Sequence, residues 1–363
     1  MVLKEKFKIA FRVDSSTQIG SGHLMRCLTL AEKLNCQEKI IFISRNLSGN
    51  ISNLVLKKGF KLILLKNEDL DLNLRGYEKW LTVRQEQDAK ETIEAIKNLN
   101  LELLIVDSYA IDVKWEKMLR PSVKKIMVID DLANRKHDCD ILLDQNFYLN
   151  GQNRYEELIG KDCKLLLGPE FVLLRDEFYE ERNKKRNNFS EIKNIFIFFG
   201  GSDLTNDTMK TLKAIFLLKS CNLKVNVVVG NSNIYKKEIE MFCNEYCWIT
   251  YYCQVDNIAE LMSQADLAIG AGGTATWERC YLGLPTIVIS VAENQRQLAL
   301  DAHKIGIIKY LGSSDNVSLN DIFEAVTYFI SNKVEYYKVK SKITELVKKW
   351  KKKDYKKLLL LER

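Results

Sequence analysis

The sequence predicts an α/β protein of two domains, each with a parallel β-sheet covered by helices on both faces. Short aliphatic segments alternate with amphipathic helical patterns along most of the chain, which is typical of buried parallel strands joined by crossover helices. The 363 residues suffice for about two domains, and 46% of them are hydrophobic, enough for packed cores. A charge-dense segment near residue 180 separates two series of strands.

The first half of the chain contains the expected strands of one sheet. They lie at residues 7–14, 39–44, 60–65, 101–107, 123–130 and 140–144, with helices after the first strand and at residues 51–58 and 83–99. Polar residues directly follow several of these strands: Asp14, Asp107, Asp130, Asp131, Asp144 and Asn146. Ligands of open α/β sheets bind beyond the carboxyl ends of the strands, so these side chains are candidate site residues. Each aspartate could equally cap the helix that follows it.

The second half repeats the alternation, with strands expected at residues 195–199, 223–229, 248–252, 265–269, 286–290 and 305–310. We therefore predict a first domain at residues 1–168, a linker at 169–192, a second domain at 193–332 and a Lys-rich tail at 333–363. The tail accounts for the net charge of +7 and is predicted to be helical at 335–357. Its lysines are expected to form a solvated helix face, and contact with anionic lipid or another acidic partner is the alternative.

Composition excludes several classes of protein. The excess of basic residues lies in the tail, so no nucleic-acid partner is expected. No apolar segment reaches the roughly 18 residues of a membrane helix, and the N-terminus lacks the apolar segment of a signal peptide. The nine cysteines have no spacing typical of zinc sites or disulfide frameworks, which indicates reduced thiols in a cytoplasmic protein.

A glycine turn with a histidine follows the first expected strand. The segment Gly20-Ser21-Gly22-His23 joins that strand to a helix in which apolar residues recur at helical spacing. The two glycines allow a tight bend and close approach of a ligand, and the amide groups of a helix start favour negative charge. The same positive end disfavours an imidazolium, so we expect His23 to be a neutral proton acceptor. A structural role is the usual one for an isolated histidine, but the turn favours a functional one.

Two further glycine turns lie in the second half. Gly270-Ala271-Gly272-Gly273-Thr274 joins a strand to a helix, and Glu278 lies one turn into that helix, where its carboxylate could bind the two hydroxyls of a ribose. The second turn, Gly200-Gly201-Ser202, is another candidate for binding phosphate. Together the turns predict a nucleotide-containing ligand between the domains. Neither a Walker pattern nor a full Gly-x-Gly-x-x-Gly fingerprint is present, which argues against an ATPase or a dehydrogenase.

The motifs in combination resemble one enzyme family. They are Arg12-Val13-Asp14-Ser15-Ser16, Gln18-Ile19-Gly20-Ser21-Gly22-His23, Asp107-Ser108-Tyr109, Ile129-Asp130-Asp131, Asp140-Ile141-Leu142-Leu143-Asp144-Gln145-Asn146, Leu174-Arg175-Asp176-Glu177-Phe178, Gly200-Gly201-Ser202-Asp203, Trp277-Glu278 and Glu293-Asn294-Gln295. In this order they resemble the UDP-2,4-diacetamido-2,4,6-trideoxy-β-L-altropyranose hydrolases of pseudaminic acid biosynthesis. The similarity extends from about residue 7 to residue 306.

The resemblance implies a GT-B-like fold, with two Rossmann-like domains whose sheets face a central cleft. It implies that water replaces UDP at the anomeric carbon of the sugar, with no metal or other cofactor, and that the partner is a small-molecule UDP-sugar. His23 is then the general base, Glu278 holds the ribose, and Tyr109 lies near the sugar. The expected substrate-binding residues are Asp14, Gly20, Ser21, Gly22, Tyr109, Arg175, Gly201, Ser202, Gly273, Thr274, Glu278, Asn294 and Gln295.

Two other functions remain open on the sequence. A glycosyltransferase of the same fold differs only in whether water or an acceptor hydroxyl reaches the anomeric carbon. A non-catalytic nucleotide-sugar sensor would need no proton acceptor at the first glycine turn, so His23 argues against it. The stereochemistry of the sugar and the oligomeric state are not given by the sequence.

Overall fold

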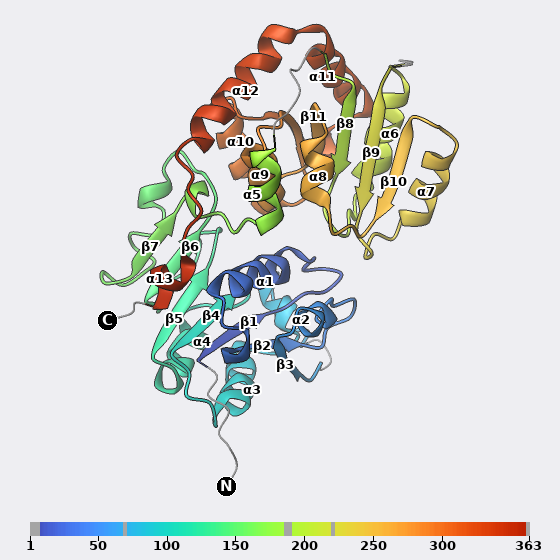
Figure 1. Cartoon of the computed structure of the whole chain (residues 1–363). Helices are drawn as coiled ribbons and strands as arrows, with labels where there is room; N and C mark the ends of the chain where they lie inside the picture. The colour runs from blue at the N-terminus through green and yellow to red at the C-terminus, as the bar shows by residue number, and fades with distance from the viewer. Residues whose placement is uncertain (1–7, 68–70, 185–190, 219–221, 361–363) are drawn as a thin grey trace. The chain divides into compact units, whose positions relative to one another are not determined.

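The computed structural model describes residues 8–67, 71–184, 191–218 and 222–360, and the chain forms two compact units (Figure 1). Unit 1 comprises Met1–Gln145, Asn150–Leu173 and Lys352–Arg363, and unit 2 comprises Asn146–Leu149 and Leu174–Lys351. Each unit contains one sheet in which the paired strands are all parallel, with helices packed on it. The predicted α/β architecture with two Rossmann-like domains is therefore confirmed.

Unit 1 contains a seven-stranded sheet of order β3-β2-β1-β4-β5-β6-β7. The strands are β1 (Ile9–Val13), β2 (Ile40–Arg45), β3 (Lys61–Leu65), β4 (Leu103–Asp107), β5 (Lys125–Ile129), β6 (Ile141–Asp144) and β7 (Lys164–Leu167). The helices are α1 (Gly22–Leu34), α2 (Asn53–Lys57), α3 (Gln85–Ile96), α4 (Val113–Leu119) and α13 (Tyr355–Leu360), together with the 3₁₀ helix η2 (Gly76–Leu81). Strand β7 and helix α4 were not predicted, because segments this short give little periodic signal.

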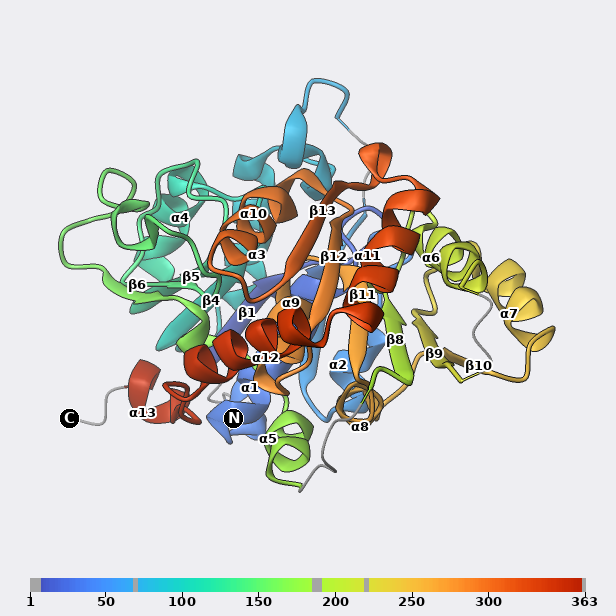
Figure 2. The same cartoon turned by 90° about the horizontal axis from the view of Figure 1, so that it is seen from above.

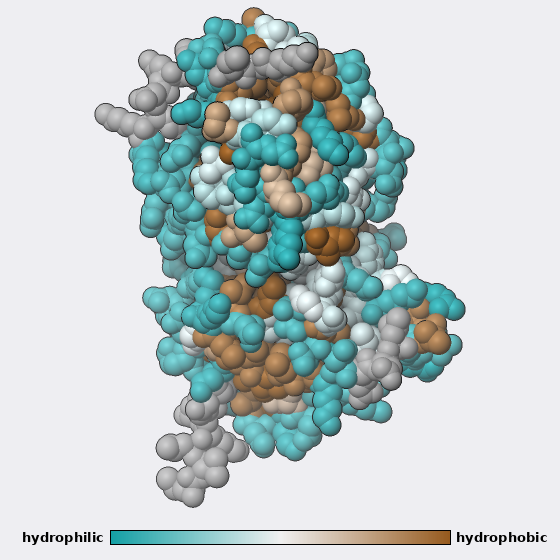
Figure 3. Space-filling view, turned by 90° about the vertical axis from the view of Figure 1, so that its right-hand side faces the viewer, coloured by the Kyte–Doolittle hydropathy of each residue, from teal (hydrophilic) through white to brown (hydrophobic). Residues whose placement is uncertain are grey.

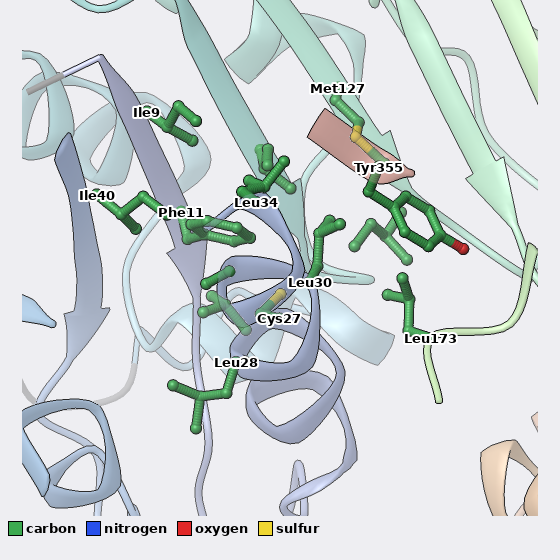
Figure 4. Close-up of a cluster of buried hydrophobic side chains, with 14 of the residues drawn as sticks. Ile9, Phe11, Cys27, Leu28, Leu30, Leu34, Ile40, Met127, Leu173 and Tyr355 are labelled. Atoms are coloured by element: carbon green, nitrogen blue, oxygen red, sulfur yellow. The ribbon is translucent and has the colours of Figure 1, made fainter. Parts of the chain in front are cut away.

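Both faces of this sheet are buried, which explains why its strands are continuously aliphatic. Ile9 and Phe11 of β1 pack with Leu30 of α1 on one face, as Figure 4 shows, whereas Ala10 contributes to the core on the other face. The rings of Phe11 and Phe42 stack with their centroids 4.7 Å apart. Packing of α1 against β1 and its neighbours fixes the position of the glycine turn that connects them.

The Lys-rich tail, expected to be helical over 335–357, forms two helices that each bury an apolar side. Helix α12 (Lys333–Val347) buries one apolar side in unit 2, and Trp350, beyond its end, stacks on Tyr281. Helix α13 packs on unit 1, where Tyr355 belongs to the core shown in Figure 4 and donates a hydrogen bond to the carbonyl of Phe171 (2.6 Å). The tail is rich in lysine, but each helix also has a few apolar residues at helical spacing, and these residues are buried.

Unit 2 contains a six-stranded sheet of order β10-β9-β8-β11-β12-β13, whose strands lie side by side in Figure 2. The strands are β8 (Asn194–Phe198), β9 (Lys224–Val229), β10 (Ile249–Cys253), β11 (Leu267–Ala271), β12 (Thr286–Ser290) and β13 (Lys309–Ser313). The other helices are α5 (Asp176–Asn183), α6 (Asp207–Phe216), α7 (Lys236–Asn244), α8 (Ile258–Ser263), α9 (Thr274–Tyr281), α10 (Arg296–Lys304) and α11 (Leu319–Ser331). Strand order and parallel pairing match a doubly wound sheet, whose ligand edge is formed by the carboxyl ends of its strands.

The segment expected as a linker, residues 169–192, contains helical structure in its described part, and its residues 185–190 lie outside the described residues. Residues Pro169–Phe171 form a 3₁₀ turn in unit 1, and α5 belongs to unit 2, where Phe178 is fully buried. Helix α5 was not predicted, because most of its residues are charged and much of its buried surface comes from one phenylalanine. The charged side chains of α5 lie at the edge of its contact with unit 2. This part of the segment is therefore a packed helix and not an extended connection.

The edge strand of unit 1 leaves apolar side chains on the surface. Leu56 of α2 and Leu64 of β3 are both exposed, and the space-filling view shows brown residues over that part of unit 1 (Figure 3). Strand β3 is at the end of the strand order, so only one side of it pairs with another strand. Its partial burial agrees with the mixed polar and aliphatic character of its sequence.

A buried charge network joins α3 to the carboxyl ends of β1 and β2. Asp88 of α3 is fully buried and accepts hydrogen bonds from Arg12 Nη2 (2.6 Å) and Arg45 Nη2 (2.7 Å). Asp14, just beyond β1, accepts from Arg12 Nη1 (2.7 Å) and from the backbone N–H of Arg45 (2.6 Å). Burial by itself would raise the pKa of Asp88, but the two arginines outweigh it and hold that pKa below its ordinary value.

Replacing Asp88 by alanine should lower the free energy of unfolding by about 3–5 kcal/mol, because two buried guanidinium groups lose their shared carboxylate. Urea denaturation followed by circular dichroism measures this loss. Glu91→Ala is the matched control, since Glu91 is partly exposed and bonds only to Arg45 (2.6 Å) in this network, and it should cost less than about 1 kcal/mol. Equal losses in the two variants would contradict the assignment.

Candidate active site

The first glycine turn leaves an open helix start in unit 1. Gly20 has φ +79°, a conformation that favours glycine, and its N–H donates to the carbonyl of Ser16 (2.8 Å). Ser21 precedes α1 without capping it through its side chain. A Cβ atom added at Gly20 or Gly22 would meet no other atom within 4 Å. The two glycines therefore line open space rather than filling a packed core, and Ser21 between them is half-buried.

His23 is the second residue of α1 and contacts the end of β4. Its Nδ1 lies 2.6 Å from Oδ1 of Asp107, the last residue of that strand. Arg26, one turn further along α1, donates to both oxygens of the same carboxylate, from Nε and Nη2, at 2.6 Å each. A carboxylate accepts but does not donate, so it selects the imidazole tautomer with the proton on Nδ1 and leaves a lone pair on Nε2.

Asp107 stays ionised in this arrangement. Burial alone would raise the pKa of Asp107, but the charge of Arg26, the nearby ring of His23 and their hydrogen bonds outweigh it and hold that pKa well below its usual value. The dipole of α1 disfavours a charged ring at His23. The structure adds an anion beside the ring, and Arg26 shares that anion and offsets its charge.

Nε2 of His23 remains accessible. Within the described residues Nε2 has no hydrogen-bond partner, and it is not fully buried. The side chain of His23 is 9% exposed, so the ring is largely enclosed and keeps a solvent-facing edge. An imidazole held at one nitrogen and open at the other has the geometry of a general base.

Aromatic rings surround His23. The ring of Tyr109 packs edge-on against it at 4.6 Å between centroids, and that of Trp80 at 5.8 Å. Trp80 also stacks on Tyr109, and Tyr77 contacts both rings. Sequence reasoning missed Trp80 and Tyr77, which lie in η2; the available signal was a pair of aromatic residues in the polar segment between a strand and a helix.

Tyr109 is fixed by a hydrogen bond to a second carboxylate. Its hydroxyl donates to Oδ1 of Asp131, whose Oδ2 accepts a hydrogen bond from Arg26 Nη1 (3.2 Å). Burial and the charge of Asp131 raise the pKa of Tyr109 far above its ordinary value, so the phenol keeps its proton. Asp107 thus contacts His23 directly, whereas Asp131 connects to the ring through Arg26 and Tyr109. The predicted site residue Asp14 lies instead in the Arg12 network described above.

In unit 2 the loop between β11 and α9 brings several predicted residues together. Gly273 has φ +92° and precedes α9 without a side-chain cap. The side chain of Gln295 packs on this loop, because a Cβ at Gly272 would lie only 3.1 Å from Gln295 Cβ. Gln295 is held there by the backbone N–H of Val291, which donates to its Oε1 (3.1 Å). The predicted neighbours Thr274 and Asn294 are the first residue of α9 and the middle residue of the 3₁₀ turn Glu293–Gln295.

Glu278 and Arg175 are also close to each other in unit 2. Arg175 Nη2 lies 3.6 Å from Glu278 Oε1, and its Nη1 lies 2.7 Å from Glu177 Oε1. Burial raises the pKa of Glu177 although Arg175 is adjacent. The neighbouring Trp277 is fully buried and donates from Nε1 to Asn146 Oδ1 (2.7 Å), which fixes the orientation of α9.

The turn at Gly201 and Ser202 differs from the other two, because a carboxylate already occupies the helix start behind it. Asp203 accepts the backbone N–H groups of Asp207 and Thr208 at 3.0 Å each, so it caps α6. Gly201 packs tightly on Gly230, where a Cβ would lie 2.3 Å from the Gly201 carbonyl oxygen. An anion at this turn would therefore meet the amides of the turn itself rather than the first amides of α6.

In residues 8–67, 71–184, 191–218 and 222–360, no three or more His, Cys, Asp or Glu side chains form a group that could hold a metal ion. No helix in the same ranges is both long enough and apolar enough to cross a membrane.

The chain is similar to a glycosyltransferase domain and to a UDP-sugar hydrolase. Residues 194–358 match the glycosyltransferase family 28 C-terminal domain. An uncharacterised protein of Methanocaldococcus jannaschii is 30% identical over 335 residues, which are 89% of this chain; the chain spans 62% of that relative's length. The UDP-2,4-diacetamido-2,4,6-trideoxy-β-L-altropyranose hydrolase of Campylobacter jejuni is 28% identical over 80% of this chain and 94% of its own.

Among solved structures, a glycosyltransferase from Rickettsia africae has a similar fold. Its TM-score is 0.61 at 12% identity, with 99% of this chain and 100% of that chain covered. At this identity the likeness concerns the fold alone. The sequence resemblance is thus confirmed as a similarity over most of the chain to a UDP-2,4-diacetamido-2,4,6-trideoxy-β-L-altropyranose hydrolase, and the fold is the two-domain GT-B-like fold of solved glycosyltransferases.

Proposed function

We propose that the protein hydrolyses a UDP-linked 2,4-diacetamido-2,4,6-trideoxy sugar, with β-L-altropyranose as the expected configuration, and releases UDP and the free sugar. The observation that carries the proposal is the bond between His23 Nδ1 and Asp107, because it leaves Nε2 as a proton acceptor at an accessible edge. The name of the Campylobacter jejuni relative supports the reaction type and the substrate class.

In the proposed reaction a water molecule attacks the anomeric carbon of the sugar. Its proton passes to Nε2 of His23 as the new carbon–oxygen bond forms. The bond between the anomeric carbon and the diphosphate oxygen breaks, and UDP leaves with the electron pair. Asp107 compensates the charge that the ring gains, while Arg26 keeps the carboxylate in place.

Unit 2 is proposed to bind the UDP part of the substrate. Glu278 would accept hydrogen bonds from the ribose hydroxyls, and the amides around Gly273 and Gly201 would receive the diphosphate. UDP is already a good leaving group, so fixed dipoles and side-chain charges can stabilise it, and we propose that no metal ion takes part. Activity should then survive dialysis against a chelator such as EDTA.

The direct experiment mixes the purified protein with the UDP-diacetamido sugar in the absence of any acceptor. Coupled detection of UDP, with mass spectrometry of the sugar, should show release of both products in equal amounts. A panel of UDP-diacetamido sugars and UDP-N-acetylglucosamine then identifies the preferred stereochemistry. Failure to release UDP from every member of the panel would overturn the proposal.

A glycosyltransferase is the second candidate, because residues 194–358 match a glycosyltransferase domain. The proposed active-site base serves either reaction, since it could deprotonate water or an acceptor hydroxyl. The acceptor-free experiment separates the two functions: a transferase would release UDP at a useful rate only after an acceptor is added.

Replacing His23 by asparagine should reduce turnover by about 10²–10⁴-fold, because a positioned base contributes a factor of that size. Affinity for UDP, measured by calorimetry, should remain unchanged, since His23 lies in unit 1 and the proposed UDP site in unit 2. His137→Asn is a control outside the proposed mechanism: His137 is buried and its Nδ1 contacts Glu116 (2.6 Å). Turnover of His23→Asn at the level of the unsubstituted enzyme would remove His23 from the mechanism.

Replacing Glu278 by glutamine should weaken UDP binding by roughly tenfold, because a carboxylate accepts stronger hydrogen bonds from ribose hydroxyls than an amide does. Isothermal titration with UDP and with 2′-deoxy-UDP measures the effect, and the variant should discriminate less between the two ligands. Glu177→Gln is the matched control, because it removes the other carboxylate beside Arg175. Unchanged UDP affinity in Glu278→Gln would refute the ribose role.

A further inference from the structure

Arg279 is a buried arginine beneath the glycine loop of unit 2. It lies on α9, and its side chain is among the largest that are fully buried. Its Nη2 donates to the carbonyl of Ala271 (2.6 Å), the last residue of β11, and reaches Thr276 Oγ1 at 3.4 Å. The guanidinium is thus attached to the end of the strand that leads into the loop.

The charge of Arg279 has no carboxylate bound to it. Its Nε and Nη1 are fully buried and have no hydrogen-bond partner, and the partners of Nη2 within the described residues are a carbonyl and a hydroxyl rather than a carboxylate. Other buried arginines differ: Arg12 and Arg26 each bind carboxylates directly. Burial lowers the pKa of Arg279 to about 10, which still leaves the group charged at neutral pH.

The guanidinium lies where two strands approach their glycine turns. A Cβ at Gly270 would lie 2.7 Å from Arg279 Nη1 and 2.1 Å from the carbonyl oxygen of Phe198. Gly270 is in β11, and Phe198 ends β8, which leads into Gly200-Gly201. Only glycine leaves room for the arginine at this point. Its cation is therefore placed under both turns proposed to receive phosphate.

We infer that Arg279 is the buried counter-charge of a nucleoside diphosphate bound at the loop between β11 and α9. This inference rests on the proposed UDP site and specifies it: the site selects the diphosphate and not merely the nucleoside. Arg279 acts without touching the ligand, as a positioning residue that holds the Ala271 carbonyl and adds positive potential to the open start of α9. A buried cation interacts strongly with a nearby anion, because little water screens it.

An unpaired buried charge destabilises a fold, so its presence needs a compensating interaction. A dianionic group at the turns would supply that interaction only when bound. The affinity of the unsubstituted protein should therefore rise along the series uridine, UMP and UDP, with the largest gain for the diphosphate. This series needs no variant, and equal affinities for the three ligands would overturn the inference.

Two variants separate the effect of the Arg279 charge on binding from the effect of its hydrogen bond to the Ala271 carbonyl. Arg279→Gln keeps a donor for the Ala271 carbonyl and removes the charge, whereas Arg279→Lys keeps the charge and removes the planar group. Calorimetry should show UDP binding weakened about tenfold or more in Arg279→Gln, and less than about threefold in Arg279→Lys, with uridine affinity unchanged in both. Thermal denaturation and circular dichroism confirm that each variant is folded.

The possible outcomes separate this inference from the proposed function. Loss of uridine and UDP affinity by the same factor in either variant would show a merely structural role and overturn the inference, while hydrolysis by the unsubstituted enzyme would still support the reaction. Charge-dependent UDP binding in a protein that releases no UDP from any UDP-sugar would support Arg279 as the counter-charge and refute the hydrolase.

Discussion

The carboxylate of Asp107, shared between His23 and Arg26, is the interaction on which the rest of the account depends. It joins the end of β4 to the first two turns of α1, elements that lie 84 positions apart at the His23 contact. Because the carboxylate accepts from Nδ1, the imidazole has a defined tautomer and orientation. Arg26 holds the carboxylate and keeps it ionised, so the group that faces Nδ1 of His23 is an acceptor.

The buried arginines of the two units differ in whether a carboxylate binds them. In unit 1, Arg12 is paired with Asp14 and Arg26 with Asp107, both at the carboxyl edge of the sheet, which makes that edge rigid around the candidate base. In unit 2, Arg279 lies below the glycine loop with two of its nitrogens unpartnered. A rigid, internally neutralised site suits a proton acceptor, whereas a site with surplus positive charge suits a ligand that brings two phosphates.

Much of this arrangement could be predicted from the sequence, and the reasons for the failures are physical. Buried parallel strands and glycine turns are local patterns, so the two sheets, the turn before His23 and the loop at Gly273 were found. Short elements such as β7 and α13 gave too few residues for a period to emerge. The pairing of His23 with Asp107, the aromatic contact of Trp80 and the unpaired state of Arg279 arise from contacts between distant segments, which one sequence does not specify.

The tautomer of His23 tests the central claim most directly. Nitrogen-15 NMR of histidine-labelled protein, at a pH where the ring is neutral and with His23→Asn used to assign its signals, reports which ring nitrogen holds the proton. The account predicts protonated Nδ1 and unprotonated Nε2, and it predicts that Asp107→Asn, which can donate as well as accept, reduces this preference. A ring with its proton on Nε2 in the unsubstituted enzyme would contradict the account, because no acceptor would then face the water.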